Sequence, residues 1–109
     1  MLKRVDKVWG HEEWIVNNEL YCGKLLYLNK DYQCSLHYHK NKDETFYVLT
    51  GKIQLEMNGT KKILYPGQSE RILPYMKHRF TGMVDSVIIE FSTHHEEDDS
   101  YRIEESRRV

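Results

Sequence analysis

The chain has 109 residues and a formal net charge of −1, with 39% hydrophobic, 12% aromatic and 30% charged residues. This length predicts a single domain over 1–109 that has enough apolar residues for one core. Basic and acidic residues are interleaved and the longest apolar runs, such as 87–91, are far too short to cross a bilayer, so neither nucleic acid nor a membrane is an expected partner.

Apolar and polar residues alternate in a series of short segments, which predicts strands separated by turns. The predicted strands cover 23–30, 33–39, 45–50, 52–57, 61–65, 69–73 and 86–92. Asn58 and Gly59 predict a hairpin turn because both tolerate positive φ, and Pro66 with Gly67 predicts a type II turn. No stretch of ten or more residues has a helical period. Strands and turns at this spacing predict an all-β sandwich or barrel.

The charge-rich stretch 94–109 follows the last predicted strand. Two alternatives remain open for its central part, 97–102: an element that folds back on the barrel as a lid or salt bridge, or a disordered acidic tail.

Cys22 and Cys34 are the only cysteines and lack a C-x-x-C spacing, which favours two reduced thiols over a disulfide. The first ten residues have no apolar core of the kind that a secretory signal carries. We therefore expect a soluble cytoplasmic protein.

One short stretch concentrates side chains that bind metals. His37 and His39 are two residues apart, so on a strand they share one face, whereas on a helix they would diverge by about 200°. A four-residue turn then reverses the chain and brings Glu44 against both imidazoles. His78 offers a third imidazole after the turn at Pro74. Such nitrogens and oxygens on one side of a site suit a divalent transition metal with open positions, and the alternative is ordinary polar groups at strand ends.

The other three histidines have no such spacing. His11, His94 and His95 are interpreted as isolated surface or interface groups.

The spacing around the first two histidines resembles the first motif of the cupin superfamily. H-x-H, four residues, E, six residues and G coincide with His37, His39, Glu44 and Gly51. This resemblance implies a single cupin-type double-stranded β-helix, a jelly-roll barrel.

The second cupin motif, P-x-G followed by H, is met less closely. Pro66 and Gly67 are adjacent, and His78 follows Pro74 in the order P-x-x-x-H-R. That variant is similar to cupins of the mannose-6-phosphate isomerase type.

Two further segments are similar to the type II isomerase domains. Residues 7–14 resemble their first strand, which implies an N-terminal strand over 1–14, and residues 88–106 resemble their closing segment. The fused guanylyltransferase–isomerases carry a shifted Q-x-H-x-H arrangement, and these 109 residues hold no nucleotidyltransferase domain. The resemblance to these isomerases therefore implies metal binding more strongly than it implies their substrate.

The resemblance implies a divalent transition metal, Zn, Mn, Fe or Ni. Its implied ligands are His37, His39, Glu44 and His78, which would leave about two positions of an octahedral shell for water or substrate. Strand alternation in a barrel puts further residues on the same face, namely Gln33, Ser35, Phe46 and Val48. Phe46 is a predicted substrate-binding residue, with an ordinary place in the core as the alternative.

The implied activity is aldose–ketose isomerisation of a phosphorylated sugar, which needs a Lewis acid and a base near C1 and C2. Glu90 is the candidate catalytic base, because it shares a strand face with Ser86 and Ser92, and Glu56 is a second choice. A strand glutamate is otherwise an ion-paired or solvated group.

Guanidinium groups match phosphate oxygens, so Arg79 is the predicted phosphate-binding residue, with Lys77 and Arg102 as further candidates. A solvated surface charge is the alternative for each. Trp9 and Trp14 are expected in the core or in a dimer interface, although tryptophan also stacks on sugars.

Two other functions compete with the isomerase. The same ligand set with redox-active iron suits a dioxygenase-type cupin, and the absence of a partner domain suggests a non-catalytic cupin that binds a sugar or another metabolite. The expected partner is a sugar or sugar phosphate. A homodimer is also expected, with the N-terminal segment as an exchanged edge strand.

Overall fold

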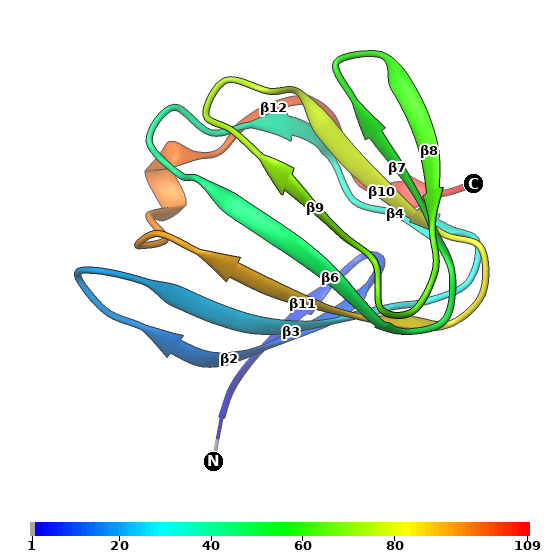
Figure 1. Ribbon diagram of the computed structural model, residues 1–109, viewed down its shortest axis with the longest axis horizontal. Helices are drawn as coiled ribbons and strands as arrows, with labels where there is room; N and C mark the ends of the chain where they lie inside the picture. Colours follow the sequence, from blue (N-terminus) through cyan, green and yellow to red (C-terminus); the bar gives the residue numbers. More distant parts are fainter. Residues whose placement is uncertain (1) are drawn as a thin grey trace.

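The computed structural model describes residues 2–109, and nearly all of its regular structure is antiparallel strand (Figure 1). The strands are β1 (Lys3–Lys7), β2 (Gly10–Asn17), β3 (Cys22–Leu28), β4 (Tyr32–Gln33), β5 (Leu36–Tyr38), β6 (Glu44–Thr50), β7 (Ile53–Met57), β8 (Thr60–Leu64), β9 (Ser69–Ile72), β10 (His78–Gly82), β11 (Ser86–Ser92), β12 (Tyr101–Glu104) and β13 (Arg107–Arg108). One 3-10 turn, η1 (Glu97–Asp99), precedes β12.

Two sheets face each other. Sheet A has the order β1-β2-β3-β11-β6-β9, and sheet B has the order β12-β5-β10-β4-β13, with the β7–β8 hairpin attached through β10. Strands that are neighbours in a sheet are often distant in sequence, as β3, β11 and β6 are. This arrangement confirms the predicted all-β, jelly-roll class.

Residues that alternate along the strands point between the sheets and form the core. The core cluster includes Trp9, Leu26, Phe46, Val48, Ile53, Leu55, Phe80 and Ile88. Trp9 and Phe80 meet edge to face, with ring centroids 5.7 Å apart, so Trp9 occupies the core as predicted.

Both predicted turns form. Asn58 and Gly59 have positive φ values of 47° and 84° between β7 and β8, and Gly67 has a φ of 87° after Pro66. Gly51, the last residue of the cupin-like motif, has a φ of 92°, and a Cβ there would overlap the side chain of Ser86. The glycine of this motif is therefore required by close packing as well as by backbone conformation.

The N-terminal segment differs from the expectation of one strand over 1–14. It forms a hairpin in which β1 pairs with β2, because the chain reverses before Gly10, whose φ is 146° and whose Cα lies against the carbonyl of Tyr27. The edge strand thus pairs within its own chain. The homodimer stays a prediction.

The C-terminal segment is ordered, which decides between the two alternatives for 97–102. β12 pairs with β5 and β13 pairs with β4, so the chain folds back along sheet B.

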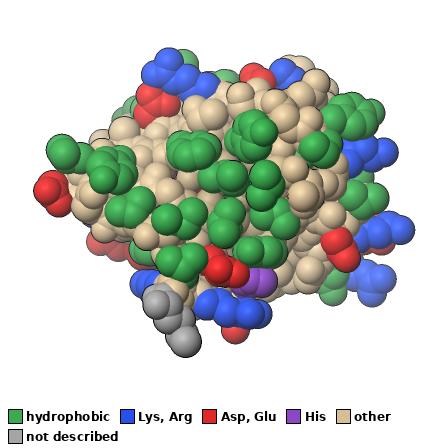
Figure 2. Space-filling model, turned by 60° about the horizontal axis from the view of Figure 1, so that its bottom comes forward, with side chains coloured by type: hydrophobic (Ala, Val, Ile, Leu, Met, Phe, Trp, Pro, Cys, Tyr) green, Lys and Arg blue, Asp and Glu red, His purple; other side chains and the backbone are tan. Residues whose placement is uncertain are grey.

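The outer face of sheet A is apolar (Figure 2). Its side chains come from adjacent strands and include Ile15, Leu25, Tyr47, Leu49, Ile89 and Phe91. The inner faces of the same strands carry the core and the polar residues described below. In the described part of the chain, no helix is long and apolar enough to cross a membrane.

Candidate metal centre

The four predicted ligands come together at the mouth of the space between the sheets. His37 lies on β5, His39 follows β5, and His78 opens β10 directly opposite His37 in the register. The ligand atoms of these three histidines all lie within 4.8 Å of one another. Glu44 opens β6 and places Oε2 3.2 Å from the Nε2 atoms of His39 and His78.

Each imidazole is oriented by a backbone carbonyl. The Nδ1 atoms of His37, His39 and His78 lie 2.8, 2.9 and 2.9 Å from the carbonyl oxygens of Ser35, Asp99 and Met76 respectively. A carbonyl only accepts hydrogen bonds, so each Nδ1 carries the proton and donates it. Each Nε2 of a neutral ring therefore holds a lone pair that faces the other ligands, which is the arrangement that outer-shell partners impose on metal-binding histidines.

Two of the facing atoms have no hydrogen-bond partner among the described residues. They are Glu44 Oε2 and His78 Nε2, both fully buried. Buried polar atoms are nearly always satisfied, and lone pairs that face one another repel unless a positive charge lies between them. Three nitrogens and one carboxylate oxygen are ligands that divalent Zn, Mn, Fe or Ni accepts, so the residues present fit a divalent transition metal.

The ionisation of the ligands favours the same conclusion. Burial raises the pKa of Glu44, but His39 and His78, when they carry a proton on Nε2, and the charge of Lys42 outweigh it and hold the pKa well below the usual range. Burial and, to a lesser extent, the neighbouring His78 together lower the pKa of His37 to about 3. An ionised carboxylate and a neutral imidazole are the forms that bind metal without first losing a proton.

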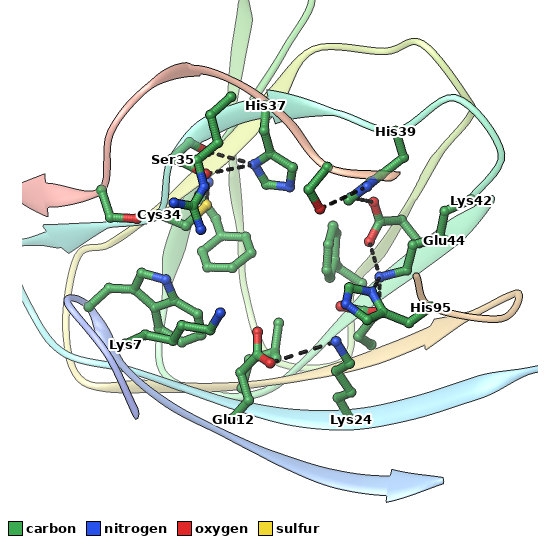
Figure 3. Close-up of a pocket in the computed structure, with 18 of the residues that line it drawn as sticks. Lys7, Glu12, Lys24, Cys34, Ser35, His37, His39, Lys42, Glu44 and His95 are labelled. Carbon is green, nitrogen blue, oxygen red and sulfur yellow. Dashed lines mark hydrogen bonds and ion pairs between the residues drawn. The ribbon is translucent and has the colours of Figure 1, made fainter. Parts of the chain in front are cut away.

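His37, His39 and Glu44 line a cavity of about 360 Å³ (Figure 3), whereas His78 is fully buried and is not one of the lining residues. Phe46 and Phe80 form part of its apolar wall and belong to the core as well. Phe46 thus combines the two roles that its sequence position suggests, pocket lining and core aromatic.

Glu90, the candidate base, also lines the cavity, and it is paired with a lysine that the sequence did not single out. Lys42 is 3% exposed and places Nζ 2.6 Å from Glu90 Oε2 and 3.8 Å from Glu44 Oε1. Burial lowers the pKa of Lys42, but the two carboxylates outweigh that effect and raise it. In sequence Lys42 is one polar residue of a four-residue turn, so no local signal marks it.

The interpretation of His95 as an isolated surface group is wrong. Its ring lines the cavity, accepts a hydrogen bond from Lys42 Nζ at Nδ1 (3.0 Å) and donates from Nε2 to Glu97 (3.0 Å). Asn17 fixes this position by accepting the backbone N–H of His95 at 3.0 Å. The contacts join residues far apart in the sequence, and spacing alone does not reveal them.

Arg79 is not a cavity residue, contrary to the expectation that it binds phosphate. Strand alternation turns His78 inward and Arg79 outward, where its guanidinium binds Glu56 at 2.6 Å and Glu104 at 3.2 Å. Glu56, the second choice of base, is therefore occupied on the outer face. Lys77 is exposed in the preceding turn, whereas Arg102 does line the cavity.

A buried lysine on the opposite wall was not predicted either. Lys24 is 2% exposed, and its ammonium lies 3.6 Å from Glu12 Oε1 and 4.1 Å from the ring centroid of Trp14 (Figure 3). Trp14 is half-buried at this wall and does not belong to the core cluster.

This fold and site define the molecule as a two-sheet β-barrel protein with a small-molecule cavity and a candidate metal centre of three histidines. Residues 25–93 match the family described as Cupin domain. The match spans more than half of the chain, and the protein belongs to this family.

Several solved structures are similar to the chain. KdgF from Halomonas sp. is 18% identical with a TM-score of 0.81, and the alignment covers 88% of this chain and 89% of KdgF. CapF, a capsular polysaccharide assembling protein from Staphylococcus aureus, is 16% identical with a TM-score of 0.83, over 95% of this chain and 34% of CapF. A Streptomyces PAC13 variant with uridine is 11% identical with a TM-score of 0.84, over 94% of this chain and 84% of PAC13. At these identities the likeness shows the fold alone. Comparison with curated protein sequences finds no match.

Proposed function

We propose that the protein is a metal-dependent cupin enzyme that interconverts the aldose and ketose forms of a phosphorylated sugar. The observation that carries the proposal is the convergence of three imidazoles with the unpartnered Oε2 of Glu44 at the edge of a cavity that the buried carboxylate of Glu90 also lines. His37, His39, His78 and Glu44 would hold the ion. Bound there, a divalent transition metal supplies a Lewis acid that polarises neighbouring carbonyl and hydroxyl oxygens.

Proton transfer in this proposal belongs to Glu90. Lys42 binds Glu90 Oε2 at 2.6 Å and Ser92 donates its hydroxyl to the same oxygen at 3.0 Å, which leaves Oε1 to exchange a proton with the sugar. The ammonium of Lys42 is the counter-charge of this proposed base. Glu90 takes the proton from C2 of the aldose, which leaves an enediol, and returns it to C1, while the hydroxyl proton of O2 is transferred to O1 to give the ketose.

The charges that line the cavity support an anionic substrate. The cationic side chains are Lys7, Lys24, Lys42 and Arg102. The carboxylates are Glu12, Glu44, Glu90 and Glu97. These four positive and four negative groups cancel, so a divalent ion would leave two positive charges in excess, which suits a phosphate dianion.

The phosphate end of the sugar is assigned to the wall opposite the metal ligands. Lys24 is buried there with its ammonium turned into the cavity, and Lys7, on the same sheet, lines the same space. These residues take the role that the sequence suggested for Arg79. One structural neighbour, Pac13, is described as a nucleoside dehydratase and its variant holds uridine, which supports a sugar-containing ligand in a barrel of this kind.

One observation favours a second candidate, a cupin that binds a sugar phosphate without turnover. Glu90 is held by an ammonium at 2.6 Å, and a base neutralised so closely is a weaker proton acceptor.

Elemental analysis of the purified protein, with turnover of hexose and pentose phosphates in D₂O followed by proton NMR, tests the proposal. We expect one transition metal per chain and incorporation of deuterium next to the carbonyl. Glu90→Gln should retain the metal and lose turnover, whereas the exposed Glu19→Gln should change neither. Absence of metal uptake would contradict the proposed centre, and metal with ligand binding but no turnover would favour the second candidate.

A further inference from the structure

The 3-10 turn η1 and the start of β12 lie against the loop that carries the chain from His39 to Glu44 (Figure 1). Residues 97–102 are called the C-terminal clasp below. The clasp is far from this loop in sequence, so its contacts there are tertiary.

Asp99 makes the principal contacts of the clasp. Its carboxylate is 5% exposed and accepts the backbone N–H groups of Lys40 at 2.9 Å, Asn41 at 3.2 Å and Lys42 at 3.1 Å. Hydrogen bonds to an ionised acceptor are stronger than neutral ones, and three of them fix the backbone of this loop. The ordered loop in turn carries Lys42 to the cavity.

The same residue also touches a proposed metal ligand. The carbonyl oxygen of Asp99 accepts the Nδ1 proton of His39 at 2.9 Å, and Ser100 Oγ lies 3.5 Å from the same nitrogen. One residue thus fixes both the loop that follows His39 and the orientation of the imidazole.

The three imidazoles differ in how they are oriented. His37 and His78 bind the carbonyl of a residue only two positions away, within their own turns of chain. His39 binds a carbonyl that is 60 positions away. Two ligands are therefore oriented locally when their strands form, and the third depends on the docked clasp.

We propose that the C-terminal clasp completes the metal centre, with Asp99 as the positioning residue for His39. The inference rests on the proposed metal centre and adds to it a claim about which residue controls its affinity. When the clasp is released, the ring of His39 rotates freely and Nε2 no longer points at the site. Coupling of this kind is reciprocal. If the docked clasp raises the metal affinity by a given factor, a bound metal raises the equilibrium constant for docking of the clasp by the same factor.

Asp99→Asn is the test variant and Asp98→Asn is its matched control. Both remove one negative charge from η1, but Asp98 is exposed and Asp99 holds the loop. Dissociation constants for Zn²⁺ come from competition with a chromophoric chelator, and the visible spectrum of the Co²⁺ form reports the ligand set. We expect Asp99→Asn to weaken metal binding about 10- to 100-fold, the usual effect of losing an outer-shell partner, and to alter the Co²⁺ spectrum. Asp98→Asn should stay near the wild type in both.

A second measurement uses the wild-type protein, so that it does not depend on the folding of a variant. Hydrogen exchange at the amides of Lys40, Asn41 and Lys42 should slow when Zn²⁺ is added, because these are the groups that Asp99 binds. Equal Zn²⁺ affinity for the two variants, or exchange at these amides that Zn²⁺ does not change, would overturn the inference while leaving the metal centre intact. A wild-type protein that takes up no metal would instead overturn the proposed function.

Discussion

Two buried carboxylates lie on the same cavity wall in opposite surroundings. Glu44, on β6, faces the Nε2 atoms of two imidazoles, and its Oε2 has no hydrogen-bond partner among the described residues. Glu90, on the neighbouring β11, faces the ammonium of Lys42 at 2.6 Å. Lys42 pairs closely with Glu90, whereas it approaches Glu44 only at Oε1, 3.8 Å away, and leaves Oε2 without a counter-charge that a metal ion would supply. This difference is why Glu44 is the proposed ligand and Glu90 the proposed base.

The largest expected effect comes from removing an imidazole on the Glu44 side. His78→Ala should abolish stoichiometric metal binding, because it removes a fully buried ligand at the centre of the cluster. Its neighbour on β10 provides a control, since Arg79→Ala acts on the outer face and should leave the metal content unchanged. Elemental analysis after dialysis distinguishes the two variants. Full metal content in His78→Ala would show that His78 is not a required ligand of the metal centre beside Glu44.

On the Glu90 side the lysine should matter for stability. Lys42→Met leaves Glu90 buried without its counter-charge, so we expect the free energy of unfolding to fall by about 3–5 kcal/mol. Lys40→Met, at an exposed position in the same loop, should change it much less. Urea denaturation of the metal-free proteins gives both values. Equal stability of the two variants would mean that the pair does not neutralise this region.

A third substitution tests the wall opposite the metal ligands. Lys24→Met should raise KM for a sugar phosphate about 10- to 100-fold with a smaller effect on kcat, because hydrogen bonds to charged groups contribute about 1.5–3 kcal/mol. The exposed Lys77→Met is the matched control. An unchanged KM in steady-state kinetics would place the phosphate elsewhere in the cavity.

The metal-free protein should also lose stability in acid. The folded state holds the pKa of His37 at about 3, whereas the unfolded chain titrates near 6.5, so the unfolded state takes up the proton first. Stability is therefore retained above pH 6.5 and falls as the pH decreases toward 3. Between pH 6.5 and 5 the loss attributable to this group is about 2 kcal/mol at most, given 1.36 kcal/mol per pKa unit. Urea titrations across this range measure it, and His37→Gln should show a flatter dependence.

The features that the sequence predicted are those that local geometry controls. Strand alternation and a four-residue turn suffice to bring His37, His39 and Glu44 together, and the same alternation places Phe46 on the cavity wall. Strand alternation also explains why Arg79 lies outside the cavity and not at the predicted phosphate site, because the residue that follows an inward-facing His78 must point outward.

The features that the sequence missed depend on contacts between distant segments. Lys42 meets His95 across 53 positions, and His39 meets Asp99 across 60. The sequence left the placement of 97–102 open and gave His95 and Lys42 no spacing that marks them, and only the folded sheets bring these pairs together. The sequence predicted one strand over 1–14 where the structure has the β1–β2 hairpin. The reason is similar, because the position of Gly10 after the turn depends on its packing against the carbonyl of Tyr27.

X-ray absorption spectroscopy of the protein loaded with one equivalent of Zn²⁺ tests whether the three histidines and Glu44 bind one metal ion. We expect three imidazole nitrogens and one carboxylate oxygen around the zinc, at distances of about 2.0–2.2 Å. A spectrum with fewer than three imidazoles, or a protein that retains no Zn²⁺ after desalting, would rule out this metal centre.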